Sequence, residues 1–186
     1  MRNCVGNKKI LFMKFTNIEI TGPQIVELDF ISDNRGFFAR SFCANEFELK
    51  GLNGQIVQIN TSFCEKKGTF RGLHYQIAPY GEVKFIRCIS GEILDVIVDM
   101  RLDSKTYLKS FSIVLSSKNR LAFYIPEGFA HAYMSLVDCS EVIYSTSQKY
   151  IPGAERGLRW DDPKLNLNLP FSPILVSEKD LSHPFI

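Results

Sequence analysis

The chain has 186 residues, of which 45% are hydrophobic, and its formal net charge at pH 7 is +2. This length predicts a single domain, residues 1–186, with a core large enough to fold without disulfides, and the hydrophobic fraction excludes a disordered chain. The small net charge and the lack of a dense run of lysine and arginine argue against nucleic-acid binding, and no apolar run is long enough to predict a membrane span.

Short strands dominate the sequence in chain order. They are rich in β-branched and aromatic residues, and turn sequences such as Asp33-Asn34-Arg35-Gly36 and Ser90-Gly91 separate most of them. The predicted strands cover residues 24–31, 37–42, 55–62, 69–76, 83–89, 93–99, 108–115, 122–125, 130–137 and 141–147. Many short strands at close spacing predict an all-β sandwich or barrel.

Helices are expected in few places. Residues 44–50 form one short candidate that Gly51 ends, and Ser177 can cap a turn over 178–180. The proline-rich segment 152–173 shows little periodicity, so we expect an ordered, loop-rich wrap there. Residues 1–12 are expected to be a loose extension.

The number and spacing of the five cysteines indicate the cellular compartment. Their number is odd and no Cys-x-x-Cys pair occurs, which is not the pattern of a disulfide framework or a zinc knuckle. Reduced thiols are therefore expected, and with them a cytoplasmic protein. The short apolar patch at 10–13 lacks the length and the cleavage site of a secretory signal.

Only three histidines occur in the chain. His183, near the C-terminus, is expected to be solvated. His131 follows a Pro126-x-Gly128 turn, which resembles the second motif of the cupins and aims the histidine into a barrel. In metal-dependent cupins other ligands come from an earlier His-x-His, but the matching region here reads His74-Tyr75-Gln76. Because a metal needs several converging ligands, no metal and no other cofactor is expected.

His74 lies three residues after Arg71, so a regular strand would send the two side chains to opposite faces. Both can line one pocket if the strand bulges, and Gly72 is the place where it can. From these residues alone, a half-buried histidine bonded to a carbonyl is the favoured interpretation of His74. Lys84 lies in an apolar strand and needs a partner, for which Asp95 in the next strand is a candidate.

Several motifs follow one another along the chain. They are Asp33-x-Arg35-Gly36-Phe37-Phe38, residues 71–76, 84–88, 91–101 and 125–131, Trp160-Asp161-Asp162-Pro163 and Ser177-Glu178-Lys179-Asp180. In this order and spacing, from about residue 16 to the end, the chain resembles the dTDP-4-dehydrorhamnose 3,5-epimerases. The resemblance implies a cupin-like β jelly roll (a double-stranded β-helix) with a few short peripheral helices. It also implies a homodimeric epimerase that inverts C3, C5 or both in a nucleotide-diphosphate 4-keto-6-deoxyhexose, in deoxysugar biosynthesis.

The resemblance implies roles for individual residues. His74 would be the base with Asp180 behind it, Tyr144 the acid on the other face of the sugar, and Lys84 the cation near the keto oxygen. The implied substrate-binding positions are Arg35, Gln58, Ile59, Asn60, Arg71, Lys84, His131, Tyr150, Glu155 and Lys179. Arg35 would reach the site of the neighbouring subunit, and Tyr150 would stack on the nucleotide base.

These residue types suit an enolate reaction. A C4 ketone acidifies the hydrogens on C3 and C5, and a histidine is a base of near-neutral pKa. A lysine can stabilise the developing oxyanion, and a carboxylate behind the histidine holds its tautomer. Contacts to the diphosphate supply binding energy that positions the sugar.

Three positions depart from the family pattern: Arg40 stands where a glutamate is usual, Ser145 where a lysine is common, and Lys149 where an aromatic is common. They indicate a subgroup whose sugar and nucleotide stay open. Two other functions also stay open, a metal-dependent cupin (a dioxygenase or a sugar isomerase) and a non-catalytic sugar-nucleotide binding module. Metal analysis would identify the first, and a lack of deuterium incorporation from solvent the second.

Overall fold

The structure is a computed structural model that describes residues 12–186, so the expected extension at 1–12 and the patch at 10–13 lie largely outside the described residues. Its strands are β1 (Lys14–Asn17), β2 (Gln24–Glu27), β3 (Phe30–Asp33), β4 (Gly36–Ala39), β5 (Gln58–Cys64), β6 (Thr69–Gln76), β7 (Lys84–Ser90), β8 (Glu92–Asp99), β9 (Ser110–Ser116), β10 (Ala122–Ile125), β11 (Phe129–Ser135), β12 (Ser140–Thr146), β13 (Glu155–Gly157) and β14 (Leu175–Val176). The helices are α1 (Ala44–Leu49) and α2 (Glu178–Leu181).

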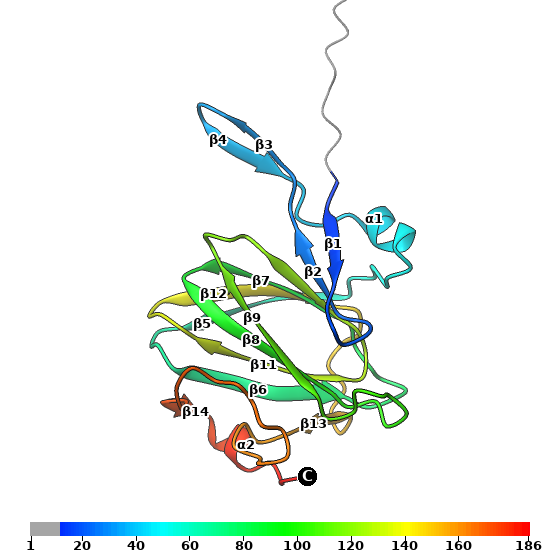
Figure 1. Ribbon diagram of the computed structural model, residues 1–186, viewed down its shortest axis with the longest axis vertical. Helices are drawn as coiled ribbons and strands as arrows, with labels where there is room; N and C mark the ends of the chain where they lie inside the picture. Colours follow the sequence, from blue (N-terminus) through cyan, green and yellow to red (C-terminus); the bar gives the residue numbers. More distant parts are fainter. Residues whose placement is uncertain (1–11) are drawn as a thin grey trace, which may run out of the picture.

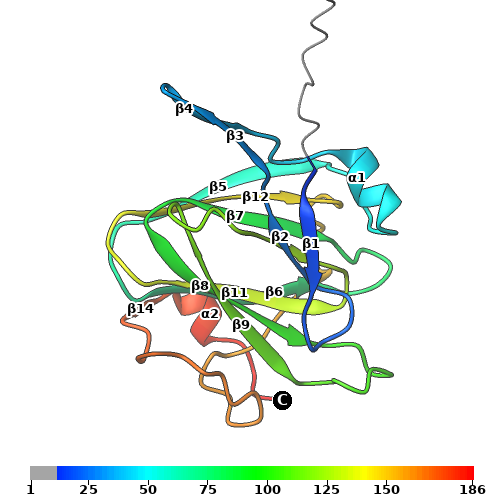
Figure 2. The ribbon, with the colours of Figure 1, turned by 45° about the horizontal axis from the view of Figure 1, so that its top comes forward.

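Two sheets face each other across the core (Figures 1 and 2). The first sheet has the order β1-β2-β10-β7-β12-β5, and the second has the order β13-β6-β11-β8-β9, with β14 added to β6. Neighbours within the two paths pair antiparallel, while successive strands of the chain often lie in opposite sheets. This is the cupin-like jelly roll that the sequence predicts.

Apolar side chains from both sheets fill the space between them. The buried members of this cluster include Ile86, Phe123 and Val142 from the first sheet and Ile97, Leu115 and Tyr133 from the second. The second sheet is also covered on its outer face. There Phe70, Leu73 and Val98 pack against Leu158 and Leu165 of the C-terminal segment.

That C-terminal segment is the loop-rich wrap predicted for 152–173. It runs beneath β6 and ends at α2 (Figure 1). Strand β6 is therefore covered by the core on one side and by this segment on the other, which explains why most of its residues are buried. The same arrangement brings residues near the C-terminus to the centre of the strand that carries His74.

The largest difference from the predicted strands concerns 24–31. The structure breaks this run after Glu27: β2 pairs with β1 and β10 in the first sheet, whereas among the described strands β3 pairs with β4 alone. The β3–β4 hairpin projects away from the two sheets (Figures 1 and 2). An apolar run does not reveal where a chain leaves its sheet, because the side chains on both sides of the break are hydrophobic.

Most other predicted strands agree with the structure within two or three residues, but β1, β13 and β14 were not predicted. The last two are only three and two residues long. No helix among the described residues is long and apolar enough to cross a membrane.

Candidate active site

A cavity of about 500 Å³ opens between the two sheets, next to α2. The predicted site residues that line it are Arg71 and His74 of β6, Lys84 of β7, His131 of β11, Tyr144 of β12, and Lys179 and Asp180 of α2. A second cavity of about 210 Å³ shares His74, Lys84 and Tyr144 with the first, so the two adjoin. It adds Gln58, Asn60, Tyr150 and Glu155.

A bulge in β6 allows Arg71 and His74 to line the same cavity. The pairing with β11 shifts register there: His131 pairs with His74, but Tyr133, two residues on, pairs with Arg71, three residues back. The backbone of Gly72 has φ +123°, and a Cβ at this position would lie 2.6 Å from the carbonyl oxygen of His131. Only glycine fits such a backbone and so close an approach. The bulge expected at Gly72 is confirmed.

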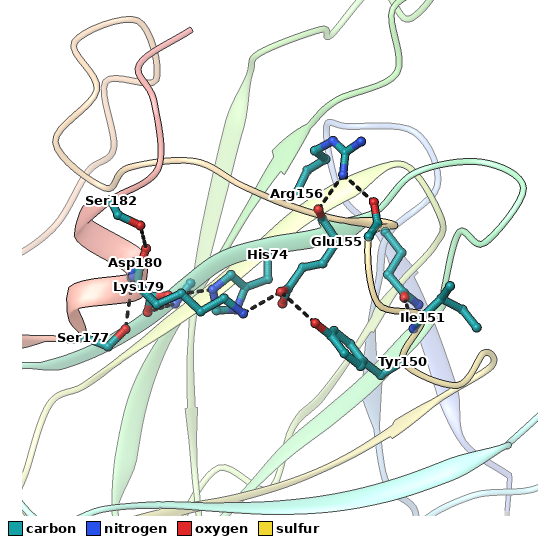
Figure 3. A network of polar contacts seen from close by, with 12 residues as sticks. His74, Tyr150, Ile151, Glu155, Arg156, Ser177, Lys179, Asp180 and Ser182 are labelled. Carbon is teal, nitrogen blue, oxygen red and sulfur yellow. Dashed lines mark hydrogen bonds and ion pairs between the residues drawn. The ribbon is translucent and has the colours of Figure 1, made fainter.

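His74 and Asp180 form a dyad (Figure 3). His74 Nε2 lies 2.7 Å from Asp180 Oδ1, and Asp180 Oδ2 accepts a hydrogen bond of 3.2 Å from the backbone N–H of Gly72. Burial raises the pKa of Asp180, but the bond to His74 and the contacts with Gly72 and Ser177 outweigh burial and hold that pKa below its ordinary value. An ionised carboxylate requires the proton on Nε2, which leaves Nδ1 as the basic nitrogen of a neutral His74.

Helix α2 holds the carboxylate of this dyad in place. Ser177 caps the helix, with its Oγ accepting a hydrogen bond of 3.1 Å from the backbone N–H of Asp180. The cap predicted for Ser177 is confirmed, and it fixes the position of Asp180 against β6.

Lys84 is buried and points toward His74. Its Nζ donates a hydrogen bond of 3.2 Å to the carbonyl oxygen of His74 and lies 3.2 Å from Glu82 Oε1. The expectation that Asp95 is the ion-pair partner of Lys84 is wrong: among the described residues Lys84 pairs with Glu82, and its charge acts on Asp95 only from a longer distance, where it opposes the rise that burial causes in the pKa of that carboxyl. Asp95 lies on β8 of the second sheet. There its Oδ2 lies 2.9 Å from Nε2 of His131, on the adjacent strand β11. Complete burial raises the pKa of Asp95, and His131 opposes that shift.

Tyr144 lies across the cavity from His74, because β12 belongs to the first sheet and β6 to the second. Burial raises the pKa of its hydroxyl, and the nearby carboxylate of Glu82 raises it further. Tyr144 therefore keeps its proton at neutral pH, as a general acid must before the reaction.

A chain of polar contacts borders the second cavity (Figure 3). Lys179 pairs with Glu155, and the Tyr150 hydroxyl donates to the same carboxylate at 3.5 Å. Burial raises the pKa of Glu155, but Lys179 and the nearby His74 outweigh it and lower that pKa. The backbone N–H of Tyr150 donates to Gln58 Oε1 at 3.1 Å, which connects the loop just before the wrap to β5.

Two predicted binding residues do not line either cavity. The side chain of Ile59 points to the outer face of β5 and is 63% exposed. Arg35 lies at the tip of the β3–β4 hairpin, where it pairs with Asp33. Arg40, the departure from the family's glutamate, forms an ion pair of 3.0 Å with Glu46 of α1.

Several lining or neighbouring residues were not predicted. Glu82 precedes Lys84 by two positions, and Tyr133 follows His131 by two. Because residues two apart in an extended chain point to the same face, their spacing from Lys84 and His131 could have identified both as lining residues. The Tyr133 hydroxyl donates to Ser62 Oγ at 2.6 Å, and burial raises its pKa. The expectation that His183 is solvated is wrong: its Nε2 is buried, and its ring centre lies 5.9 Å from that of His74.

The residues do not fit a cupin-type metal site. Gln76, at the position of the second histidine of a cupin His-x-His, donates to Glu82 and to the carbonyl oxygen of Lys149, and accepts from the backbone N–H of Ile151. Within residues 12–186, one group of three metal-ligating side chains has closely placed ligand atoms, and His131 is not a member of it. The donors that a cupin metal needs therefore do not converge.

Comparison with known proteins agrees with this geometry. The family model described as dTDP-4-dehydrorhamnose 3,5-epimerase matches residues 17–186. An epimerase of that name from Shigella flexneri is 40% identical over 171 residues, which are 91% of this chain and 94% of the relative. One from Methanothermobacter thermautotrophicus is 39% identical over 90% of this chain and 91% of its own.

Solved structures give the same result. The Bacillus anthracis epimerase with TDP and PPi bound has a TM-score of 0.90 at 36% identity, covering 94% of this chain and 100% of that one. The Legionella pneumophila enzyme in complex with dTDP-4-keto-L-rhamnose has a TM-score of 0.87 at 35% identity, covering 94% and 93%. As its motifs predict, the chain belongs to the dTDP-4-dehydrorhamnose 3,5-epimerase family.

Proposed function

We propose that this chain is an isomerase that inverts C3, C5 or both in a dTDP-linked 4-keto-6-deoxyhexose, in deoxysugar and cell-surface polysaccharide biosynthesis. One observation carries the proposal: the His74–Asp180 dyad and Tyr144 come from opposite sheets and line one cavity that also contains Lys84. A base and an acid on opposite sides of a bound sugar are what inversion of a carbon centre requires.

The first step makes an enolate. Nδ1 of His74 takes the proton from C3 or C5, and the electron pair of that C–H bond forms the C=C bond while the carbonyl π pair moves to O4. Lys84 stabilises the negative charge on that oxygen, and its burial makes the interaction stronger than it would be in water. Asp180 stabilises the imidazolium that forms.

The second step returns a proton to the opposite face. The Tyr144 hydroxyl gives its proton to the same carbon, the C4 carbonyl reforms, and the centre is inverted. Tyr144 is then a phenolate and His74 an imidazolium, and proton exchange with solvent restores both. Glu82 disfavours a negative charge on Tyr144, so it favours reprotonation of the phenolate from solvent after the reaction.

The remaining polar residues would hold the substrate. Arg71, His131 and Lys179 would contact the sugar and diphosphate, with Glu155 positioning Lys179. The second cavity would take the nucleotide, with Gln58, Asn60 and Tyr150 around it and Ile59 contributing through its backbone. The chain would act as a homodimer in the cytoplasm as one domain, with Arg35 contacting the site of the second subunit.

Proton NMR of candidate substrates in deuterated water tests this function. The purified chain is mixed with 4-keto-6-deoxyglucose carried by dTDP, by UDP or by GDP. The proposal predicts loss of the C3 or C5 proton signal, deuterium incorporation and a new epimer, with the dTDP sugar reacting fastest. Binding of the dTDP sugar without any exchange would instead identify a sugar-nucleotide binding module.

A further inference from the structure

The proposed reaction uses only part of a group of three side chains beside β6. His74 and Asp180 are the base and its positioning carboxylate, whereas His183 has no role in the reaction. One ligand atom from each of these residues lies within 4.8 Å of the other two. Asp180 lies in α2 and His183 just beyond its end, so one short segment brings both to His74.

His183 has a ring nitrogen without a partner. Within residues 12–186, its buried Nε2 makes no hydrogen bond, and the ring packs tightly against the backbone of Gly157. A ring nitrogen that no hydrogen bond occupies keeps its lone pair available, and the neutral imidazole is the form that binds metals.

We propose that His74, Asp180 and His183 form a binding site for a divalent transition-metal ion, with Zn²⁺ as the preferred ion, and that the bound ion inhibits the enzyme. Two imidazole nitrogens and one carboxylate oxygen are a donor set of three-ligand zinc sites, with a fourth position left for water. Zinc–ligand bonds of about 2.0–2.2 Å in a tetrahedron place ligand atoms about 3.4 Å apart. The 2.7 Å between His74 Nε2 and Asp180 Oδ1 would therefore widen, and the nitrogen of His183 would adjust to the same spacing.

The local charge suits a cation. The carboxylate of Asp180 is buried between His74 and the backbone N–H of Gly72. Lys179 lies nearby, but its ammonium pairs with Glu155, which offsets its repulsion. The carboxylates of Asp180 and Glu155 therefore outnumber the one ammonium beside them.

Inhibition follows from the tautomer of His74. A metal on Nε2 takes the lone pair of that nitrogen, so the proton that Nε2 gives to Asp180 must move to Nδ1. Nδ1 then carries a hydrogen and cannot accept one from the sugar. The metal thus blocks the base without contacting the substrate, and this part of the inference rests on the proposed function.

Metal binding itself is tested without any assay of activity. The full chain is stripped with a chelator and titrated with Co²⁺, a spectroscopic substitute for Zn²⁺, while visible absorption is followed. We expect one equivalent to give the intense bands of four-coordinate cobalt and Zn²⁺ to abolish them. His183→Ala should lose these bands, whereas Cys139→Ser, which removes an exposed cysteine, should keep them.

Inhibition is tested with the same variants. Zn²⁺ should inhibit the epimerisation of the dTDP sugar, and a chelator should restore it. His183→Ala should keep its basal rate and require about a hundredfold more Zn²⁺ for half inhibition. Cobalt bands that survive in His183→Ala, or equal zinc sensitivity of the two proteins, would overturn the site. Should no nucleotide sugar react, the proposed function fails, and the cobalt titration still decides whether the metal site exists.

Discussion

Three ionisable side chains at the centre of the site each have a carboxylate partner. Asp180 holds His74, Asp95 holds His131, and Glu82 holds Lys84. A buried charge without a partner would be costly, so these pairs fix the protonation state and the direction of each group before a substrate arrives.

Only some of these pairs could be predicted from the sequence. The motif containing Asp180 identified the partner of His74 although 106 positions separate the two residues. The partner of Lys84 was predicted wrongly because His131 on the adjacent strand takes Asp95, while Glu82, two positions before Lys84, supplies the carboxylate. Spacing along the chain does not show which of two nearby cationic groups a buried carboxylate pairs with.

The pH dependence of stability should report on Asp180. Its pKa is lower in the folded protein than in the unfolded chain, so it stabilises the fold above the ordinary aspartate pKa of about 4, and this contribution disappears as the pH falls through the lower folded value. We therefore expect Asp180→Asn to lower the urea midpoint at pH 7, and we expect the midpoints of the variant and the parent protein to converge in acid. Urea titrations from pH 7 downward measure both. A difference that grows in acid would contradict the assigned direction.

Arg71→Ala should raise KM more than it lowers kcat. A contact to the diphosphate is present in both the ground state and the transition state, so its loss weakens binding without slowing the chemical step to the same extent. Steady-state kinetics with the dTDP sugar provide the measurement, with Arg156→Ala as control because the Arg156 guanidinium bonds only to backbone carbonyls of the wrap. A collapse of kcat at constant KM would place Arg71 in the chemistry.

Among the elements, β6 does the most to build the site. It carries His74 and Arg71, pairs with β11, β13 and β14, and receives Asp180 from α2 at the backbone of Gly72. The strand and its bulge were predictable from Gly72 and the alternation of the sequence. Its pairing with β13 and β14 was not, since strands of two or three residues have no detectable period.

Gly72→Ala should destabilise the protein by about 2 kcal/mol or more, because a Cβ there would be strained at positive φ and would lie 2.5 Å from Cβ of Ala132. Gly153→Ala is a matched control, with φ +86° and no atom within 4 Å of the added Cβ, so it should cost only about 1 kcal/mol. Chemical denaturation of both variants gives the comparison. Equal midpoints would show that the approach of β11 to Gly72 is not tight.

At the scale of the whole molecule, the β3–β4 hairpin and the outer face of β5 expose apolar side chains. Phe38 is 67% exposed, and Ile59 and Phe63 are also exposed. A hairpin that projects from the two large sheets and exposes phenylalanines to solvent is suited to contact with a second subunit. The sequence predicted the hairpin turn and the dimer, but a single chain does not show which surface the hairpin would cover.

Mixed subunits test the homodimer and the shared site together. Alone, Arg35→Ala should raise KM, and His74→Asn should be inactive. In a mixed dimer, the Arg35→Ala subunit keeps His74 and receives Arg35 from its partner, so one complete site should form. We expect refolded mixtures to recover activity that neither parent has at low substrate concentration, with a solution mass twice 21.2 kDa. A monomeric mass, or no recovery, would contradict the shared site.

The central claim, that His74 removes a proton on one face of the sugar and Tyr144 returns one on the other, is tested most directly by NMR of the dTDP 4-keto sugar in deuterated water. His74→Asn should lose both exchange and epimerisation, by about a hundredfold to ten-thousandfold. Tyr144→Phe keeps the ring, so the enolate should form, collapse on its original face and incorporate deuterium without full inversion. Exchange that survives in His74→Asn but vanishes in Tyr144→Phe would reverse the two assignments, and unchanged rates in both variants would contradict the account.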